Sequence, residues 1–174
     1  MSYQYVLSQI FICFGYIFFG IGMQKKNKVE LLKYNCVFYF FISLGFILLG
    51  SIVGLISPVC GFFRNMIFIH NEKRNKQNSV LILILLSLIA IFFTTVLYES
   101  PVDLIPCLLT IIGIVSYWCK GTKFTRIGTC LLCILSIIFS FSINSWFTII
   151  CESYVLIATV IGFMKYNVKK NNEI

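Results

Sequence analysis

Charged side chains are scarce in this chain: Asp, Glu, Lys and Arg make up only 11% of its 174 residues. A soluble domain carries about 25% charged residues, so the scarcity excludes a water-soluble globule. The hydrophobic content of 59% also excludes intrinsic disorder, because a disordered chain must be poor in apolar residues.

Sequence motifs for catalysis and metal binding are also missing. The chain has no phosphate-binding Gly-rich loop, no nucleophile elbow and no zinc-protease helix. Its one His, His70, lacks the companion ligands that a metal site requires. The eight Cys lie in or at the ends of apolar stretches and resemble small apolar residues. We therefore predict no enzyme activity, no metal site and no cofactor.

The apolar residues form blocks long enough to cross a hydrocarbon layer of about 30 Å, which takes about 17 to 25 residues as a helix. Backbone groups in lipid must bond within helices or a closed barrel, and barrel strands would alternate polar and apolar residues. These continuous runs therefore predict an all-α membrane protein with seven transmembrane helices in the lipid bilayer. The predicted spans are residues 5–23, 34–50, 52–69, 80–98, 104–118, 127–141 and 146–164.

Basic residues collect in every second connection between these spans. The exception among the 14 basic residues is Arg64, inside the third span. Because Lys and Arg gather in cytoplasmic loops, the pattern predicts an N-terminus outside and a C-terminus in the cytoplasm. No signal peptide is visible, so the first span is expected to be a retained helix. The basic residues after the first, third, fifth and seventh spans are Lys25, Lys26, Lys28, Lys33, Lys73, Arg74, Lys76, Lys120, Lys123, Arg126, Lys165, Lys169 and Lys170.

The first three and the last three spans share one layout: a helix, a basic loop, a helix, a short outer turn, and a helix with one charge and a basic end. The uniformly aliphatic fourth span is expected to be a lipid-facing linker. An odd linker leaves both triplets pointing the same way, as in parallel-repeat transporters. The predicted organisation is 3+1+3, with repeats at 1–70 and 101–166, a linker helix at 80–98 and a cytoplasmic tail at 167–174.

The charges buried within the spans are the strongest candidates for a functional site. An ionisable group at the bilayer centre costs about 3 kcal/mol on insertion scales, and Glu152 lies about 9 Å below the outer end of its span. One interpretation is a polar cavity between the triplets, with Glu152 as a proton or cation site and Arg64 with Asn65 binding an anionic or polar group. The predicted substrate-binding residues are Gln9, Arg64, Asn65, Thr110 and Glu152.

A second interpretation needs no ligand. Arg64 can extend its charge to the cytoplasmic headgroups, and Glu152 can be a protonated or Ser-bonded core carboxyl. The Gly, Ser, Thr and Cys residues that share faces with them can serve close helix packing alone. Both interpretations stay open at the level of the sequence.

Several short motifs resemble the YgjV-like family of bacterial inner membrane proteins. They are PVDLIP at 101–106, CKG at 119–121 followed by Arg126, Glu152 early in the last span, and the basic end of that span. The N-terminal half is similar through Gln9, the first basic loop and Arg64. This resemblance implies a multi-pass protein of the bacterial cytoplasmic (inner) membrane.

The 3+1+3 layout is also similar to that of the SWEET and PQ-loop transporters. Those proteins carry prolines on several core helices as hinges for alternating access. Here the first, second and sixth spans contain no Pro, and the chain has no Pro-Gln dipeptide. The likeness therefore extends to the layout and not to the hinges.

We predict a small transporter or facilitator that moves a polar solute between the two triplets. The expected partners are the bilayer, a small polar or anionic solute and a proton. Nucleic acid is not expected, because the basic charge belongs to membrane orientation and anionic lipid. The alternative is a non-transporting membrane scaffold or complex subunit, whose polar stripes serve packing. The substrate, coupling ion and oligomeric state stay open.

Overall fold

The computed structural model describes residues 3–50, 52–96, 104–142 and 146–168, and within these ranges every regular element is helical. This confirms the predicted all-α class. The elements are α1 (Tyr3–Met23), α2 (Lys28–Leu48), α3 (Ile52–Lys73), α4 (Val80–Val96), α5 (Leu104–Trp118), α6 (Thr122–Ser142), α7 (Trp146–Phe163) and a final π-helical turn, η2 (Met164–Val168).

Several of these helices are suited to a membrane by length and composition. Within the described residues, four segments are long and apolar enough to cross it: Tyr3–Met23, Lys28–Leu48, Thr122–Phe141 and Trp146–Asn167. Shorter apolar helices lie at Val80–Phe93 and Cys107–Trp118. A chain with this many apolar helices, and large hydrophobic side chains exposed along them, buries that surface in lipid.

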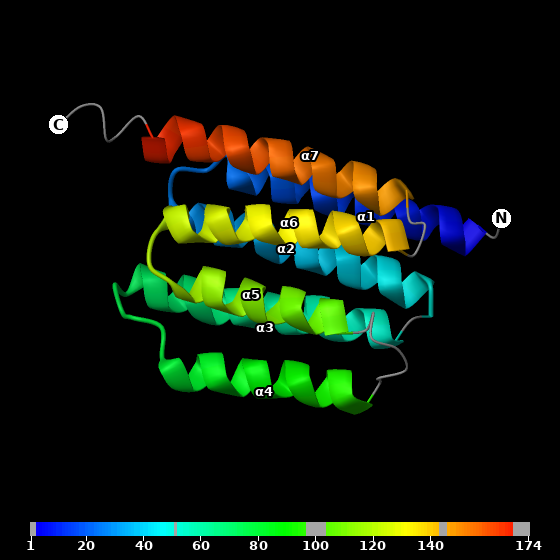
Figure 1. Cartoon of the computed structure of the whole chain (residues 1–174), viewed down its shortest axis with the longest axis horizontal. Coiled ribbons are helices and arrows are strands. Elements are labelled where there is room, and N and C mark those ends of the chain that lie inside the picture. Colours follow the sequence, from blue (N-terminus) through cyan, green and yellow to red (C-terminus); the bar gives the residue numbers. More distant parts are fainter. Residues whose placement is uncertain (1–2, 51, 97–103, 143–145, 169–174) are drawn as a thin grey trace.

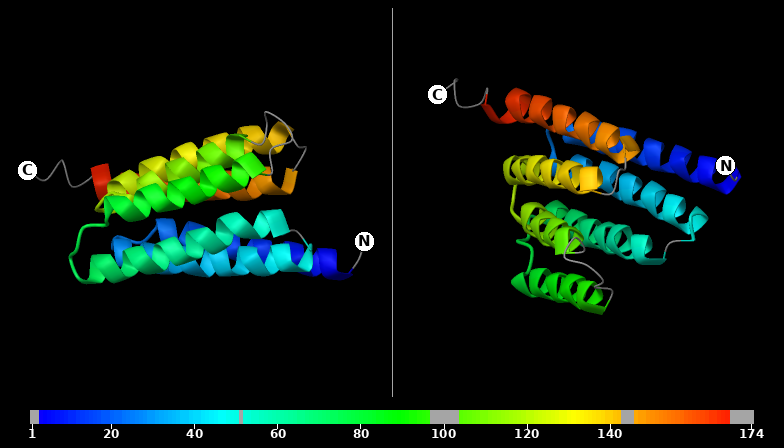
Figure 2. Two further views of the ribbon diagram at one scale, coloured as in Figure 1. Left: turned by 90° about the horizontal axis from the view of Figure 1, so that it is seen from below. Right: turned by 45° about the vertical axis from the view of Figure 1, so that its right-hand side comes forward.

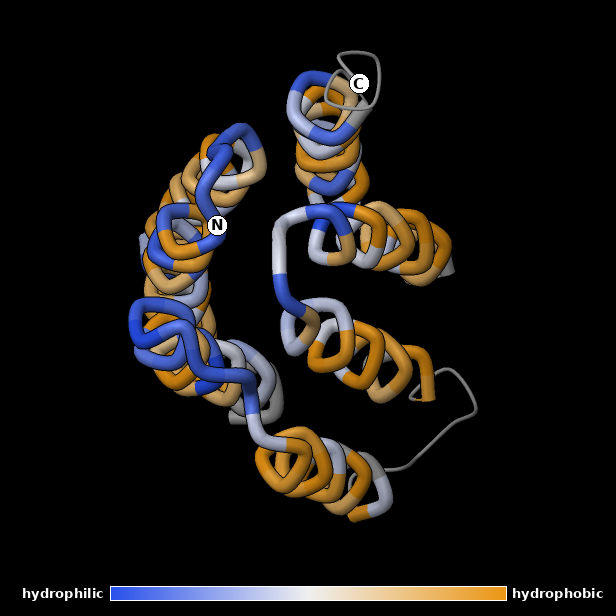
Figure 3. The backbone as a smooth tube through the Cα atoms, turned by 90° about the vertical axis from the view of Figure 1, so that its left-hand side faces the viewer, coloured by the Kyte–Doolittle hydropathy of each residue, from blue (hydrophilic) through white to orange (hydrophobic). Residues whose placement is uncertain are grey.

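The helices form two layers (Figures 1 and 3). One layer holds α1, α2 and α3 in a row, and the other holds α7, α6 and α5, so that α1 lies beside α7 and α3 beside α5. Helix α4 lies at the edge of the bundle, next to α5 and α3. Leu81, Leu88 and Phe92 on α4 are largely exposed, as expected of a lipid-facing helix.

The two ends of the bundle differ in chemistry. The connections after α1, α3 and α5 lie at one end together with the end of α7, and the N-terminus lies at the other (Figure 1). The hydrophilic segments gather at the former end (Figure 3), which we call the basic end. The second layer is inclined to the first, so the layers lie closer together at the basic end (Figure 2, left).

Three helices extend well beyond the predicted spans at the basic end. Helices α2 and α6 begin at Lys28 and Thr122, inside connections predicted as basic loops, and α3 continues to Lys73. The Asn27 side chain caps α2 by accepting a hydrogen bond from the Val29 amide at 2.9 Å. Gly121, with φ of +83°, makes the turn just before α6. Apolar runs alone do not reveal these polar helix ends, because the polar turns lie outside the apolar stretch that defines each predicted span.

The described helices pack closely at glycines. A Cβ added to Gly20 on α1 would overlap the Tyr154 ring of α7, and one added to Gly61 on α3 would overlap the Tyr39 ring of α2. Gly162 on α7 lies directly against the Met23 carbonyl. These contacts agree with small residues serving close helix approach. The predicted outer turn at 99–103, residues 143–145 of the predicted outer turn at 142–145, and tail residues 169–174 lie outside the described residues.

Candidate functional site

Arg64 lies on α3 between the two layers. Its side chain is only 4% exposed. Its Nε and Nη2 both donate to the Asn65 Oδ1 at 3.2 Å, and Nη2 also donates to the Tyr39 hydroxyl at 3.1 Å. Arg64 is nine residues before the end of α3, or about 13 Å along its axis. The guanidinium is thus held within the bundle.

The second layer meets Arg64 through α5. The guanidinium carbon lies 4.5 Å from the centre of the Tyr117 ring, close enough for a cation–π interaction. Gly113, one turn earlier, leaves the space beside Arg64 free of a side chain, and a Cβ added there would lie 3.4 Å from Nη1. The guanidinium therefore lies between an aromatic face and a glycine of the opposite layer.

The positive charge of Arg64 has no acidic partner in the described part of the chain. The one ion pair found there joins Lys28 to Glu72 at 2.7 Å. Removing a guanidinium from water costs several kcal/mol unless an opposite charge compensates it, and tyrosine faces and amide oxygens compensate only in part. This arrangement leaves a positive site that favours an anion.

Within the described residues, two buried amide atoms have no hydrogen-bond partner: Nδ2 of Asn65, which bonds to Arg64, and Oδ1 of Asn35, which bonds to Tyr117. Both asparagines are fully buried. Buried polar atoms of this kind are uncommon and call for a ligand or water. One is a donor and the other an acceptor. We call the group Asn35, Tyr39, Arg64, Asn65 and Tyr117 the polar centre.

A chain of hydrogen bonds fixes the orientation of Asn35. The Thr129 hydroxyl donates to the Thr125 carbonyl at 2.8 Å, so it accepts from the Tyr117 hydroxyl at 3.4 Å. The Tyr117 oxygen in turn accepts from Asn35 Nδ2 at 2.6 Å. The amide oxygen of Asn35 is consequently the atom left without a partner.

Glu152 on α7 lies in a separate cluster. Its Oε1 accepts hydrogen bonds from the Tyr16 hydroxyl of α1 at 2.9 Å and from the Ser136 hydroxyl of α6 at 3.1 Å. The carboxyl group thus joins the two layers where α1 meets α7. Glu152 is half-buried, and hydroxyl groups of α1 and α6 hold its carboxyl group.

An aromatic path joins the two clusters. The Tyr16 ring lies edge-on to Phe38, with ring centres 5.4 Å apart, and Phe38 lies 5.0 Å from the ring of Tyr39. Tyr16 bonds to Glu152, and Tyr39 bonds to Arg64. The acidic and basic groups predicted to share one cavity therefore occupy two clusters connected through side chains of α1 and α2.

Two further predicted site residues, Gln9 and Thr110, lie on α1 and α5. Gln9 donates to the Ser8 hydroxyl at 3.4 Å, and it precedes Tyr16 by about 10 Å of helix. Thr110 is half-buried on α5, two turns before Tyr117. Of the five predicted residues, the structure thus brings together Arg64 and Asn65 and holds Glu152 in the separate cluster with Tyr16 and Ser136.

Three members of the polar centre were not among the predicted site residues: Asn35, Tyr39 and Tyr117. Tyr117 lies at the end of an apolar run, where Tyr often marks the headgroup level, but its side chain is only 1% exposed. Two signals were present in the sequence. Asn35 and Tyr39 lie four residues apart, on one helix face, and an Asn among apolar residues needs a polar partner within a membrane.

Polar contacts hold the basic end together. Lys28, which is 5% exposed, bonds to Glu72 and to the Cys119 carbonyl, and so connects α2, α3 and the α5–α6 connection. Asn78 donates to the Trp118 carbonyl at 2.9 Å and accepts from the Trp118 indole through its own carbonyl at 3.0 Å. Both contacts join the two halves of the chain.

Arg126 also belongs to this end, and its predicted place in a basic loop is wrong. It is fully buried on α6. Its guanidinium donates to the carbonyls of Met23 and Lys25 at 3.2 and 2.6 Å, and to the side chains of Thr122 and Asn167 at 3.1 and 2.6 Å. Arginine favours such carbonyls at a helix C-terminus because of their partial negative charge. Unlike Arg64, Arg126 is well provided with partners.

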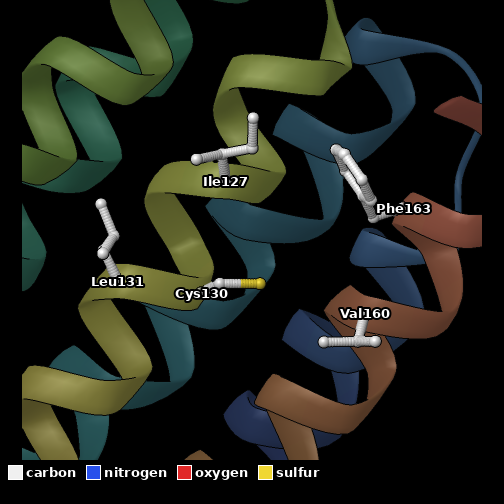
Figure 4. Close-up of a pocket in the computed structure, with 5 residues that line it drawn as sticks. All are labelled: Ile127, Cys130, Leu131, Val160 and Phe163. Atoms are coloured by element: carbon white, nitrogen blue, oxygen red, sulfur yellow. The ribbon is translucent and has the colours of Figure 1, made fainter. Parts of the chain in front are cut away.

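A groove of about 270 Å³ opens between α6 and α7 (Figure 4). It contains none of the predicted site residues, and its apolar lining suits a hydrocarbon chain better than a polar solute. Within the described residues, no cluster of three or more His, Cys, Asp or Glu side chains is arranged to hold a metal ion. The residues that line the groove are Ile127, Cys130, Leu131, Val160 and Phe163.

Comparison with known proteins identifies a family for this chain. The family model Imp-YgjV, described as bacterial inner membrane protein, matches residues 6–170. No curated protein and no solved structure matches the chain. The match covers both layers, the polar centre and the Glu152 cluster.

Proposed function

Because this chain belongs to the Imp-YgjV family of bacterial inner membrane proteins, we propose that it is a transporter or facilitator of a small polar solute. The protein is a multi-pass protein of that membrane. The proposed path runs between the two helix layers and through the polar centre. The proposed activity is transport without catalysis.

The proposed topology has all seven helices crossing the bilayer, with the N-terminus outside and the C-terminus in the cytoplasm. The gathering of the basic connections at one end supports this orientation. A fluorescent protein fused to the C-terminus should fold and fluoresce in the cytoplasm. A fusion that is exported and does not fluoresce would indicate the opposite orientation.

Two observations support a SWEET-like 3+1+3 repeat. A two-fold axis along the membrane normal would relate α1 to α5 and α3 to α7, and this places α1 beside α7 and α3 beside α5, as found. Asn35 and Thr129 occupy corresponding positions near the starts of α2 and α6, and both bond to Tyr117. Corresponding residues of the two triplets thus meet at the interface.

The uncompensated charge of Arg64 is the observation that carries the proposal. A purely structural interface would place a carboxylate or a set of carbonyls around a buried guanidinium, as around Arg126. Around Arg64 the neighbours are neutral, and two amide atoms are unpaired. A charge of this kind, buried between the layers of a membrane bundle, is typical of a substrate pathway.

The contacts at the basic end support a cytoplasm-closed state for the proposed transporter. Lys28 and Asn78 tie the halves together there, whereas the layers diverge toward the other end (Figure 2). Opening to the cytoplasm would require these contacts to separate. Glu152, held by Tyr16 and Ser136, is the proposed proton site.

The proposal can be tested in vesicles that contain the purified protein. Vesicles are mixed with an excess of glycerol, L-lactate or phosphate, and reswelling is followed by light scattering. With at least one solute, we expect vesicles that contain the protein to reswell faster than protein-free vesicles. In Arg64→Ala, the reswelling rate should fall to that of the protein-free vesicles. Rates equal to those of protein-free vesicles for every solute would reject transport.

A non-transporting scaffold or complex subunit is the second candidate. The direct packing of Gly20, Gly61 and Gly162 against neighbouring helices favours it, because these small residues serve helix contact alone. A scaffold would show no solute flux and would lose stability in Arg64→Ala. A transporter would show solute flux, and Arg64→Ala would abolish this flux without unfolding the protein.

A further inference from the structure

The free atoms of the polar centre form a pattern that selects one class of solute. Arg64 offers positive charge, Asn65 Nδ2 offers a neutral N–H, and Asn35 Oδ1 offers an acceptor. We infer that the polar centre binds a small α-hydroxy carboxylate. This inference rests on the proposed function and names the substrate class for the same site.

The carboxylate is assigned to Arg64 and Asn65. Within the described residues, Arg64 uses Nε and Nη2 for its bonds to Asn65 and Tyr39, which leaves Nη1 on the side next to Gly113. A planar carboxylate can accept from Nη1 and from a neighbouring amide N–H at once. It also supplies the single negative charge that Arg64 lacks. A phosphate dianion would bring a second charge for which the polar centre has no cation.

The hydroxyl group is assigned to Asn35. The buried Oδ1 can only accept a hydrogen bond, so the bound molecule must present a donor to it. Tyr117 joins this oxygen to the charged part of the site, because its ring faces Arg64 while its hydroxyl binds the Asn35 amide. A solute that carries a carboxylate and a hydrogen-bond donor therefore matches the charge and the hydrogen-bonding groups of the polar centre.

A neutral hydroxyl suits this donor position better than an ammonium group. An ammonium placed beside Asn35 would add a second positive charge close to Arg64, and this repulsion opposes binding. The same reasoning disfavours an amino acid as the solute.

Four closely related probes test the inference on the full-length protein in detergent. L-lactate carries both groups, propionate lacks the hydroxyl, L-lactamide lacks the charge, and inorganic phosphate replaces the carboxylate. Binding is measured by thermal shift and by calorimetry. We expect L-lactate to bind at least about tenfold more tightly than propionate, because propionate leaves Asn35 Oδ1 unpaired, and more tightly than lactamide or phosphate.

Asn35→Leu should bring L-lactate down to the affinity of propionate and leave propionate unchanged. Lys76→Gln, which changes an exposed residue of the basic end, is the control and should preserve the wild-type order. The ligand series on the wild-type protein tests the inference even if Asn35→Leu fails to fold.

Each other outcome overturns the inference in a distinct way. Equal affinity for L-lactate and propionate would show that Asn35 does not bind the hydroxyl group, and stronger binding of phosphate or L-lactamide would show that the solute is not a hydroxy carboxylate. In those cases vesicle reswelling can still establish transport. Absence of binding by all probes overturns the substrate class, and absence of reswelling with every solute rejects transport itself.

Discussion

The Arg64 guanidinium lies 4.5 Å from the centre of the Tyr117 ring, and this contact joins α3 of one helix layer to α5 of the other. It places a positive charge against an aromatic face with no carboxylate beside it in the described residues. Arg126, on α6, shows the opposite arrangement, with backbone and side-chain oxygens around its guanidinium. The same side chain thus has two environments in one protein.

Arg64→Met should stabilise the solute-free protein and abolish binding of an anionic solute. Replacing an uncompensated buried charge with an apolar side chain removes a desolvation cost of about 1 kcal/mol or more. Thermal unfolding in detergent measures the change as a higher midpoint. Arg126→Met is the matched control and should lower the midpoint, because it leaves the carbonyls of Met23 and Lys25 without a donor. A lower midpoint for Arg64→Met would make Arg64 a structural residue.

Glu152→Gln should abolish the pH dependence of solute uptake. The amide oxygen of Gln can still accept from Tyr16 and Ser136, whereas the amide cannot gain or lose a proton in the working range. Uptake by vesicles is measured from mildly acidic to mildly alkaline pH. Ser136→Ala keeps the carboxyl group and serves as the control. Unchanged pH dependence in Glu152→Gln would reject the proton site.

Gly20→Ala should destabilise the contact between α1 and α7 by about 1 to 3 kcal/mol. The new methyl group would overlap the Tyr154 ring. Gly113→Ala adds the same group where the nearest atoms lie at 3.4 and 3.7 Å, so its loss of stability should be smaller. The midpoints of thermal unfolding compare the two. Equal losses would show that helix approach at Gly20 is not tight.

Lys28→Met should loosen the basic end. It removes the bonds to Glu72 and to the Cys119 carbonyl and leaves that buried region without its connecting cation. With Cys119 as the sole cysteine, its labelling by a membrane-impermeant maleimide on the cytoplasmic side should accelerate several-fold. Lys33→Met changes an exposed lysine on the same helix and should leave the rate unaltered. Equal rates in all three proteins would exclude a closing role for Lys28.

The sequence alone determined the helical class and most of the segment positions. Continuous apolar runs predicted residues 104–118 as one span, and α5 occupies Leu104–Trp118. Arg64 and Glu152 stood out because a charge in an apolar run is costly wherever the helix lies in the bundle. Such conclusions need only local information: hydrophobicity, length and charge.

The tertiary structure decided which polar groups meet. It placed Arg64 against Tyr117 and Glu152 against Tyr16, and it buried Lys28 and Arg126, which the sequence assigned to loops. Helical periodicity gives the face of each residue, but the partner across the interface depends on how each helix is rotated and shifted against the next. Many side chains of several helices fix those rotations together, so no single segment encodes the polar centre.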